Sequence, residues 1–358
     1  MDGFAVRASD TLGASASAPA YLKLGGDVPT GTAPAVAVET GIAVRIHTGA
    51  MMPAGADAVV MVEDTHEAGT LEIEILAAAA PGENVLQIGE DVLAGAVAAP
   101  AGLRLRPADL GALAALGITR VAVRARPRVA ILSTGDEVVP AGSVPGLAQV
   151  RDVNAATLRA VVERAGGEAV ACGIVGDDEI ALERALRDAR DRADLVVVSA
   201  GSSVSVRDLT ARVVDRIGRP GVLVHGIAIK PGKPTVLALC DGIPVVGLPG
   251  NPASALVVAW RIVRPLIRML GGEAVDDDGL GDERECWATL AAPVPSRPGR
   301  EEYVPCTLRR GDGDERIAVP LFGASNLIFT LARADGLIAI PLDRAGHHAG
   351  DRVRIVVP

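Results

Sequence analysis

Two lysines in a stiff turn are the first residues of this 358-residue chain whose spacing suggests chemistry. Lys230 and Lys233 lie in the segment Lys-Pro-Gly-Lys-Pro, where two prolines fix the backbone φ angle and hold both ammonium groups on a rigid backbone. Lysine is a compact point charge suited to binding an oxyanion. Two solvated surface charges are the plainer interpretation, but the prolines and a neighbouring helix start favour an anion site.

Two small-residue segments could bind the same anion. Residues 247–254, Gly-Leu-Pro-Gly-Asn-Pro-Ala-Ser, begin a predicted helix, and the first N–H groups of a helix have no partner within it. Those groups and the hydroxyl of Ser254 make a site ready for an anion. The loop at 199–203, which ends in Ser203, would also let backbone N–H groups approach an anion, although such a loop alone is weak evidence.

Carboxylates also occur where predicted strands end and loops lead into helices. Glu137 and Asp177 come just after apolar runs, and Asp208 follows the loop at 199–203. Each has an ordinary structural explanation, because acidic residues are common in turns and at helix starts. Together they form a donor set for a hard cation such as Mg²⁺ that bridges to a substrate phosphate. We therefore predict a phosphoester, pyrophosphate or tetrahedral oxyanion substrate, handled by positioning and electrostatics.

The elements that must position these side chains follow from the hydrophobic pattern. Apolar runs alternate with amphipathic helical stripes between residues 128 and 270; the runs are 129–132, 169–174, 195–199, 223–229 and 245–248. Nearly continuous apolar strands that alternate with helices predict an α/β fold with a central, doubly wound, mostly parallel sheet. In such a sheet ligands bind beyond the carboxyl ends of the strands, where the lysines and carboxylates fall.

The flanking sequence predicts other domains. The N-terminal part is rich in Gly, Pro, Val and Thr and predicts a β-rich domain, with strands at 43–46, 58–62 and 71–75. A connector follows, with a short helix at 107–116 that proline opens and a strand at 120–123. Short strands near the C-terminus predict a small, barrel-like β-domain. The predicted domains are 1–99, 100–127 (a connector belonging to a linker domain), 128–273 (the α/β domain) and 274–358.

Composition excludes several functions. The chain has 35 Lys+Arg against 44 Asp+Glu and only two Trp, two Tyr and three Phe, so it lacks the basic surface and the stacking platforms of a nucleic-acid binder. The apolar stretch 253–270 contains three arginines, which argues against a membrane span. No export leader opens the chain, and four widely spaced cysteines are typical of a reducing compartment. We expect a cytoplasmic protein.

Six motifs in order resemble those of the molybdopterin molybdenumtransferase family, MoeA and the gephyrin-type E domain. They are Met-Asp-Gly-Phe-Ala at 1–5, Arg-Ile-His-Thr-Gly-Ala at 45–50, Gly-Glu-Asp at 89–91, Thr-Gly-Asp-Glu at 134–137, Lys-Pro-Gly-Lys-Pro at 230–234 and Gly-Leu-Pro-Gly-Asn-Pro at 247–252. Each motif is weak alone, but all six in this order are highly specific. Looser matches are Gly-Arg-Glu-Glu-Tyr at 299–303 and Gly-Ala-Ser at 323–325.

The resemblance implies the last step of molybdenum cofactor assembly. Members of this family take adenylated molybdopterin, bind molybdate and, with Mg²⁺ as cofactor, insert molybdenum while AMP leaves. The resemblance also implies that the central domain is of the molybdopterin-binding type. It implies a homodimer whose site lies where domains of both subunits meet, and the molybdopterin adenylyltransferase is a further candidate partner.

The resemblance also assigns roles to single residues. The catalytic residues it implies are Asp2, Thr48, Asp91 and Glu137. The residues it implies for Mg²⁺ and the pyrophosphate are Glu137, Asp177 and Asp208. The residues it implies for molybdate or the pterin phosphate are Lys230, Lys233, Ser254, Ser325 and Ser203.

The chain departs from the family pattern in three places. Ala200 and Ser205 replace two glycines of the loop Gly-Gly-x-Ser-x-Gly and would hinder a positive φ or a close ligand approach. Pro305 replaces an arginine, so molybdate would depend on the lysines, or on Arg309 or Arg310. The family also has a segment before Met-Asp-Gly, whereas this chain starts within that motif.

Three functions therefore stay open. The first is the transferase, and the second is a non-catalytic pterin-binding scaffold in which the altered loop disables turnover. The third is a relative that only adenylates molybdopterin, against which the additional β-segments and the Met-Asp-Gly and Lys-Pro-Gly-Lys-Pro motifs argue. We favour the transferase.

Overall fold

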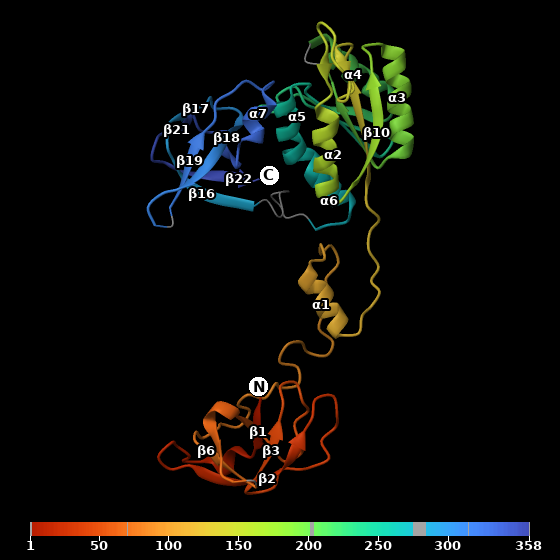
Figure 1. Cartoon of the computed structure of the whole chain (residues 1–358). Helices are drawn as coiled ribbons and strands as arrows, with labels where there is room; N and C mark the ends of the chain where they lie inside the picture. The colour runs from red at the N-terminus through yellow and green to blue at the C-terminus, as the bar shows by residue number, and fades with distance from the viewer. Residues whose placement is uncertain (1, 70, 201–203, 275–283, 314, 358) are drawn as a thin grey trace. The chain divides into compact units, whose positions relative to one another are not determined.

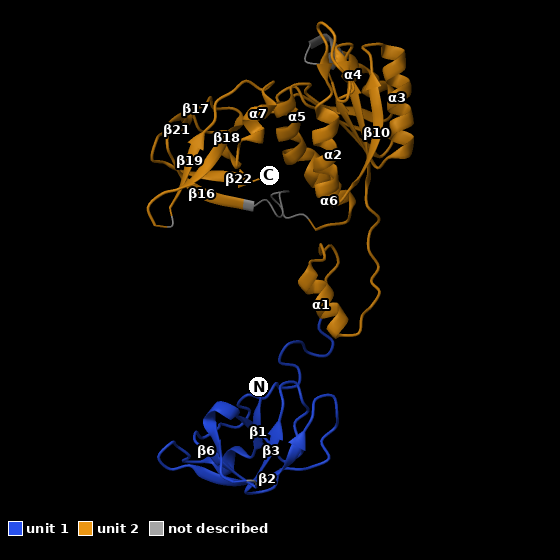
Figure 2. Ribbon diagram, in the orientation of Figure 1, with its two compact units in different colours: residues 1–98 blue, residues 99–358 orange. Residues whose placement is uncertain are grey.

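The computed structural model describes residues 2–69, 71–200, 204–274, 284–313 and 315–357 (Figure 1), without the side chains of 204–208 and 284. The chain forms two compact units, residues 1–98 and 99–358 (Figure 2), and each has its own apolar core. Among the described residues, no helix combines the length and apolarity that crossing a lipid bilayer requires.

The first unit is built on a six-stranded sheet of order β4-β1-β3-β2-β6-β5. Its strands are β1 (Gly3–Val6), β2 (Ala20–Val28), β3 (Ile42–Ile46), β4 (Ala58–Met61), β5 (Thr65–Glu67) and β6 (Glu72–Ile75), with 3₁₀ turns at Ala8–Thr11 and Val62–Asp64. Alternate residues of β1 enter two apolar clusters, Phe4 in one and Ala5 in the other, so both faces of this strand are covered. The predicted β-rich domain is confirmed.

The α/β domain in the second unit has a six-stranded sheet of order β10-β7-β11-β15-β14-β12, in which β14 pairs antiparallel with both its neighbours and the other pairings are parallel. The strands are β7 (Arg128–Thr134), β10 (Glu168–Val175), β11 (Leu195–Ser199), β12 (Pro220–His225), β14 (Val236–Cys240) and β15 (Ile243–Leu248). A short parallel pair, β8 (Val138–Val139) and β9 (Val150–Arg151), follows β7. The predicted mostly parallel sheet is confirmed.

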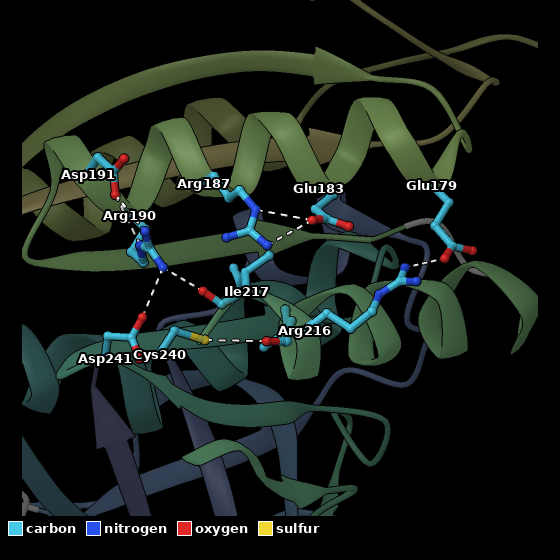
Figure 3. Close-up of polar contacts among 10 residues, drawn as sticks. Glu179, Glu183, Arg187, Arg190, Asp191, Arg216, Ile217, Cys240 and Asp241 are labelled. Carbon is cyan, nitrogen blue, oxygen red and sulfur yellow. Dashed lines mark hydrogen bonds and ion pairs between the residues drawn. The ribbon is translucent and has the colours of Figure 1, made fainter. Parts of the chain in front are cut away.

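Helices cover both faces of this sheet, as a doubly wound fold requires. One face packs against α2 (Asn154–Arg164) and against α5 (Pro252–Val258), which continues through a π-helical turn (Ala259–Val263) into α6 (Arg264–Leu270). The other face packs against α3 (Glu179–Arg192) and α4 (Val204–Ile217). Figure 3 shows Arg216 of α4 paired with Glu179 of α3, and Arg190 of α3 bound to Asp241 after β14 at 3.1 Å.

The C-terminal region is a closed five-stranded barrel in which β18, β19, β16, β22 and β20 follow one another and β20 pairs back onto β18. Its elements are β16 (Arg284–Leu290), β17 (Val294–Pro295), β18 (Glu301–Arg310), β19 (Arg316–Pro320), α7 (Ile328–Ala332), β20 (Gly336–Ile340), β21 (Gly346–His347) and β22 (Arg352–Val357). The barrel-like domain is therefore confirmed.

Two predicted strands need correction. The apolar run 223–229 is not one strand: β12 ends at His225, Gly226 adopts φ +94°, and β13 (Ile229–Lys230) pairs in parallel with β18 of the barrel. No strand forms at 120–123, where Val121 and Val123 are exposed. The predicted helix at 107–116 is present as α1 (Pro107–Ala115), and Asp109 accepts hydrogen bonds from the backbone and side chain of Arg106 at its start.

Candidate active site

A cleft of about 920 Å³ lies within the second unit, between the sheet's carboxyl edge and the barrel. The lysine turn, defined as residues 230–234, forms part of its wall together with the start of α5, the beginning of β18 and the loop 321–327. Four of the five predicted substrate-binding residues line it: Lys230, Lys233, Ser254 and Ser325. The fifth, Ser203, lies outside the described residues.

Strand directions explain why the lysine turn reaches this edge. The turn belongs to the connection from β12 to β14, and Val236 at the start of β14 lies opposite Gly247 near the carboxyl end of β15. Within the connection, the Thr235 hydroxyl donates to the Gly232 carbonyl at 2.7 Å. Gly232 has φ +128°, and a Cβ there would lie 2.4 Å from Cγ2 of Val258, so only glycine fits without a shift.

The two lysines have different electrostatic surroundings. The Lys230 Nζ lies 2.5 Å from Oε1 of Glu302, whose side chain is 6% exposed and also accepts hydrogen bonds from Ser296 and Arg300. Lys233 is exposed and forms no ion pair within the described part of the chain. Lys233 therefore carries the less compensated charge toward a substrate, while Lys230 is already half of an ion pair.

Glu302 is ionised at neutral pH. Burial raises the pKa of its carboxyl group, but hydrogen bonds from Lys230 and Ser296, with the charges of Lys230 and Arg300, outweigh burial and lower that pKa below its ordinary value. Sequence reasoning did not assign Glu302 or Arg300 a role. The motif Gly-Arg-Glu-Glu-Tyr holds both and was the signal available, with Arg300 just before β18 and Glu302 within that strand.

The start of α5 is tied to the loop 321–327. The backbone N–H of Ala253 donates to the carbonyl oxygen of Ser325 at 3.0 Å, and Asn251 Nδ2 donates to the Ser325 hydroxyl at 2.9 Å. One of the helix N–H groups expected to bind an anion is thus used inside the fold. Ser254 is buried, and Asn154 of α2 reaches across to the Gly250 carbonyl at 2.9 Å.

Two predicted metal ligands lie on neighbouring loops at the same sheet edge. Glu137 follows β7 and Asp177 follows β10, and the Asp177 N–H donates to Oδ1 of Asp136 at 3.0 Å. Burial, and then the charges of Asp136 and Glu137, raise the pKa of Asp177. Neither Glu137 nor Asp177 lines the cleft, which lies toward β15 and β14.

The donor set at these loops fits a cation in part. Oδ1 of Asp177 is buried and has no hydrogen-bond partner, beside two further carboxylates, which is the chemistry Mg²⁺ seeks. The side chain of Asp208, the third predicted ligand, lies outside the described residues. Within the residues that are described, no group of three or more His, Cys, Asp or Glu side chains is arranged to hold a metal.

Two of the predicted catalytic residues meet in the first unit. The backbone N–H and the hydroxyl of Thr48 both donate to Oδ1 of Asp2, at 2.7 and 2.9 Å, and these bonds lower the pKa of Asp2. The residue after Asp2 must be glycine, because a Cβ on Gly3 would lie 2.1 Å from the carbonyl oxygen of Val60. Asp91 is exposed in the irregular segment after β6.

The departures from the family pattern fall in different places. Pro305 lines the cleft, and so does Arg300, whereas Arg309 and Arg310 are exposed at the end of β18 and are not among the residues lining it. Ala200 is buried, with its N–H donating to the Leu248 carbonyl at 3.1 Å. Nothing is described for the Ser205 side chain.

Three family models match consecutive parts of the chain. The MoeA N-terminal region (domain I and II) matches residues 1–117, the probable molybdopterin binding domain matches 130–269, and the MoeA C-terminal region (domain IV) matches 288–357. The three matches follow one another in the order in which the β-rich unit, the sheet and the barrel occur.

Curated relatives and solved structures extend this likeness over the whole chain. A molybdopterin molybdenumtransferase from Nostoc is 35% identical over 99% of this chain and 81% of its own length. Molybdopterin molybdenumtransferase 2 of Mycobacterium tuberculosis is 36% identical over 99% of this chain and 87% of its own. The crystal structure of the molybdopterin biosynthesis moeA protein from Pyrococcus horikoshii is 29% identical, covers 100% of this chain and 86% of its own, and aligns with a TM-score of 0.82. The chain belongs to the MoeA family of molybdopterin molybdenumtransferases.

Proposed function

We infer that this chain is an enzyme of molybdenum cofactor biosynthesis that inserts molybdenum into molybdopterin. The observation that carries the inference is the cleft in which Lys233, Arg300, Ser254 and Ser325 converge, because these groups suit an oxyanion such as molybdate. The names of the curated relatives support the same activity.

We propose further that the substrate is adenylated molybdopterin and that AMP leaves. Lys233 and Arg300 would hold the molybdate oxygens, and Glu302 would hold Lys230 beside them. Glu137, Asp177 and Asp208 would bind Mg²⁺, which when bound neutralises charge on the pyrophosphate. The cleft and the carboxylate loops share one sheet edge, so pyrophosphate and molybdate would bind along the same edge.

The proposal includes the assembly of the enzyme. We expect a homodimer to which Asp2, Thr48 and Asp91 contribute, and a reaction that adenylates molybdopterin must supply the substrate, with the molybdopterin adenylyltransferase as the candidate partner. The cysteines Cys172, Cys240, Cys286 and Cys306 are all free thiols, which supports a cytoplasmic location.

The test is molybdate-dependent AMP release from adenylated molybdopterin in the presence of Mg²⁺, measured by chromatography. Lys233→Ala should lower turnover about 100-fold, because a preorganised cation for the oxyanion is lost. Lys23→Ala removes an exposed lysine of β2 and should leave turnover unchanged. Wild-type protein that binds pterin but releases no AMP would instead be the non-catalytic scaffold. That alternative is considered because Ala200 and Ser205 replace two glycines of the family's loop.

A further inference from the structure

The lining of the cleft includes apolar side chains as well as charged groups. Phe322 lines the cleft and its side chain remains 65% exposed, with Leu321 and Leu327 beside it on the same loop. Aromatic residues make up only 2% of the sequence, and of the exposed ones Phe322 lines the cleft, whereas Tyr21, Trp287 and Phe329 do not. Because the ring of Phe322 stays mostly in water, its burial contributes little to the stability of the fold.

The loop that carries Phe322 is fixed on both sides. Before it, the Leu321 N–H donates to the carbonyl oxygen of Pro305 in β18 at 2.7 Å. After it, Ser325 is held by Asn251 and by the N–H of Ala253 at the start of α5. Between them, Gly323 packs so closely against α7 that a Cβ would lie 2.6 Å from Oγ1 of Thr330. Phe322 is therefore presented by a loop anchored to the walls of the cleft.

The chemistry of the cleft identifies what would cover this ring. Lys233 and Arg300 attract an anion, and Phe322 offers a flat apolar face in the same cleft. A ligand complementary to both has a phosphate or oxyanion joined to a planar heteroaromatic ring. Such rings stack favourably on exposed aromatic side chains.

We propose that Phe322 is the stacking platform for the pterin ring of the substrate, an assignment that rests on the proposed function. Adenylated molybdopterin carries a second planar ring, the adenine. The carboxylates proposed to serve the pyrophosphate follow β7 and β10, whereas Phe322 lies on the barrel side, toward β15. The adenine therefore belongs with the carboxylates, and the pterin with Phe322.

Binding titrations on the full chain test this assignment. The dissociation constants of a pterin monophosphate and of AMP are measured for wild type, Phe322→Ala, Phe322→Leu and Phe322→Trp. The alanine and leucine variants should bind the pterin about tenfold more weakly and AMP as wild type does. The tryptophan variant should keep pterin affinity and show quenching of the new indole fluorescence on binding. Phe329→Ala removes a phenylalanine that is 72% exposed on α7 but does not line the cleft, and should change nothing.

Three results would each overturn the assignment, and the first two are unchanged pterin affinity in Phe322→Ala and weaker binding of AMP in place of the pterin. Equal losses in Phe322→Ala and Phe329→Ala would also refute it, because they would show a general effect of exposed phenylalanines. The AMP-release assay on wild type is independent of these titrations. Normal release with no effect of Phe322 refutes the platform alone, and pterin binding through Phe322 without release refutes the transferase alone.

Discussion

At the scale of the residue, the two lysines of the turn are chemically unequal although they belong to one motif. Lys230 Nζ is held by the buried carboxylate of Glu302, and Lys233 is exposed. A carboxylate beside an anion site repels the anion, so the ion pair limits how much positive charge Lys230 offers. The affinity of the cleft for molybdate should thus depend more on Lys233 than on Lys230.

Glu302→Gln tests the ion pair through stability. Losing the carboxylate should lower the free energy of unfolding by about 2 kcal/mol, less than for a fully buried pair because Lys230 is 49% exposed. Urea denaturation measures the difference. Glu301→Gln is the matched control: its partner Arg354 lies 3.8 Å away and both side chains are partly exposed, so its loss should cost below 1 kcal/mol. Equal losses in the two variants would contradict the special role of Glu302.

The same pair fixes the sign of a pH effect. The pKa of Glu302 is below its ordinary 4.5, so its stabilisation is present above that value and is lost as the pH falls through the lowered pKa. The difference in unfolding free energy between wild type and Glu302→Gln should therefore be constant near pH 7 and shrink below about pH 4.5. A difference that stays the same down to pH 3 would show that the carboxylate charge is not involved.

At the scale of the element, the sequence predicts the strands of the central sheet well, but it does not predict the short strand β13 beside the lysine turn. Buried parallel strands are continuous apolar runs, which is why β7, β11 and β15 lie close to the predicted ranges. The prediction of one strand over 223–229 was wrong because Gly226, with its positive φ, ends the strand although the residues around it remain mostly apolar. Pairing of β13 with a strand some 70 residues later is a long-range contact, and no local pattern encodes it.

The same reasoning explains which site residues could be predicted. Lys230, Lys233, Ser254 and Ser325 come from short motifs, and the structure brings them to one cleft. Arg300, Glu302 and Phe322 reach it only because the barrel closes and packs beside the sheet. Their position depends on tertiary packing, so the loose motif that contains Arg300 and Glu302 assigned neither a role, and Phe322 had no signal.

Gly232→Ala tests whether the shape of the turn matters. The added Cβ would meet Val258 at 2.4 Å and also strain a backbone at φ +128°, so molybdate affinity measured by calorimetry should fall at least tenfold. Gly242→Ala is the control, because its φ of +89° is also positive but nothing lies within 4 Å of the added atom. That variant should lose stability by about 1 kcal/mol from strain and still bind molybdate. Normal molybdate binding by Gly232→Ala would show that the anion does not need this turn.

At the scale of the whole molecule, the residues that the family resemblance implies for the site occur in both units of the chain. Asp2 and Thr48 are joined in the first unit, and the cleft and the carboxylate loops belong to the second. Around α1 the second unit also exposes apolar side chains, including Leu110, Leu116 and Val123. Exposed apolar groups gathered along one segment favour a protein interface, in agreement with the proposed homodimer.

Light scattering after gel filtration tests that homodimer. The expected mass is twice the 36.5 kDa of the chain. Leu110→Asp and Val123→Asp should shift the mass toward one copy, because a charge would be buried without a partner. Leu147→Asp places the same charge at a fully exposed site between β8 and β9 and should leave the mass unchanged. A wild type that elutes as a single copy at all concentrations would exclude the homodimer.

The short strand β13 has one more consequence, for how such a chain can be rearranged. In sequence it lies between the sheet strands β12 and β14, but it pairs with the barrel, with Ile229 opposite Glu301 and Lys230 opposite Glu302. A gene fragment cut after α6 would keep both lysines and lose the neighbour that orders one of them. Exchanging the barrel for that of a relative should accordingly alter anion selectivity even when every residue of the lysine turn is retained.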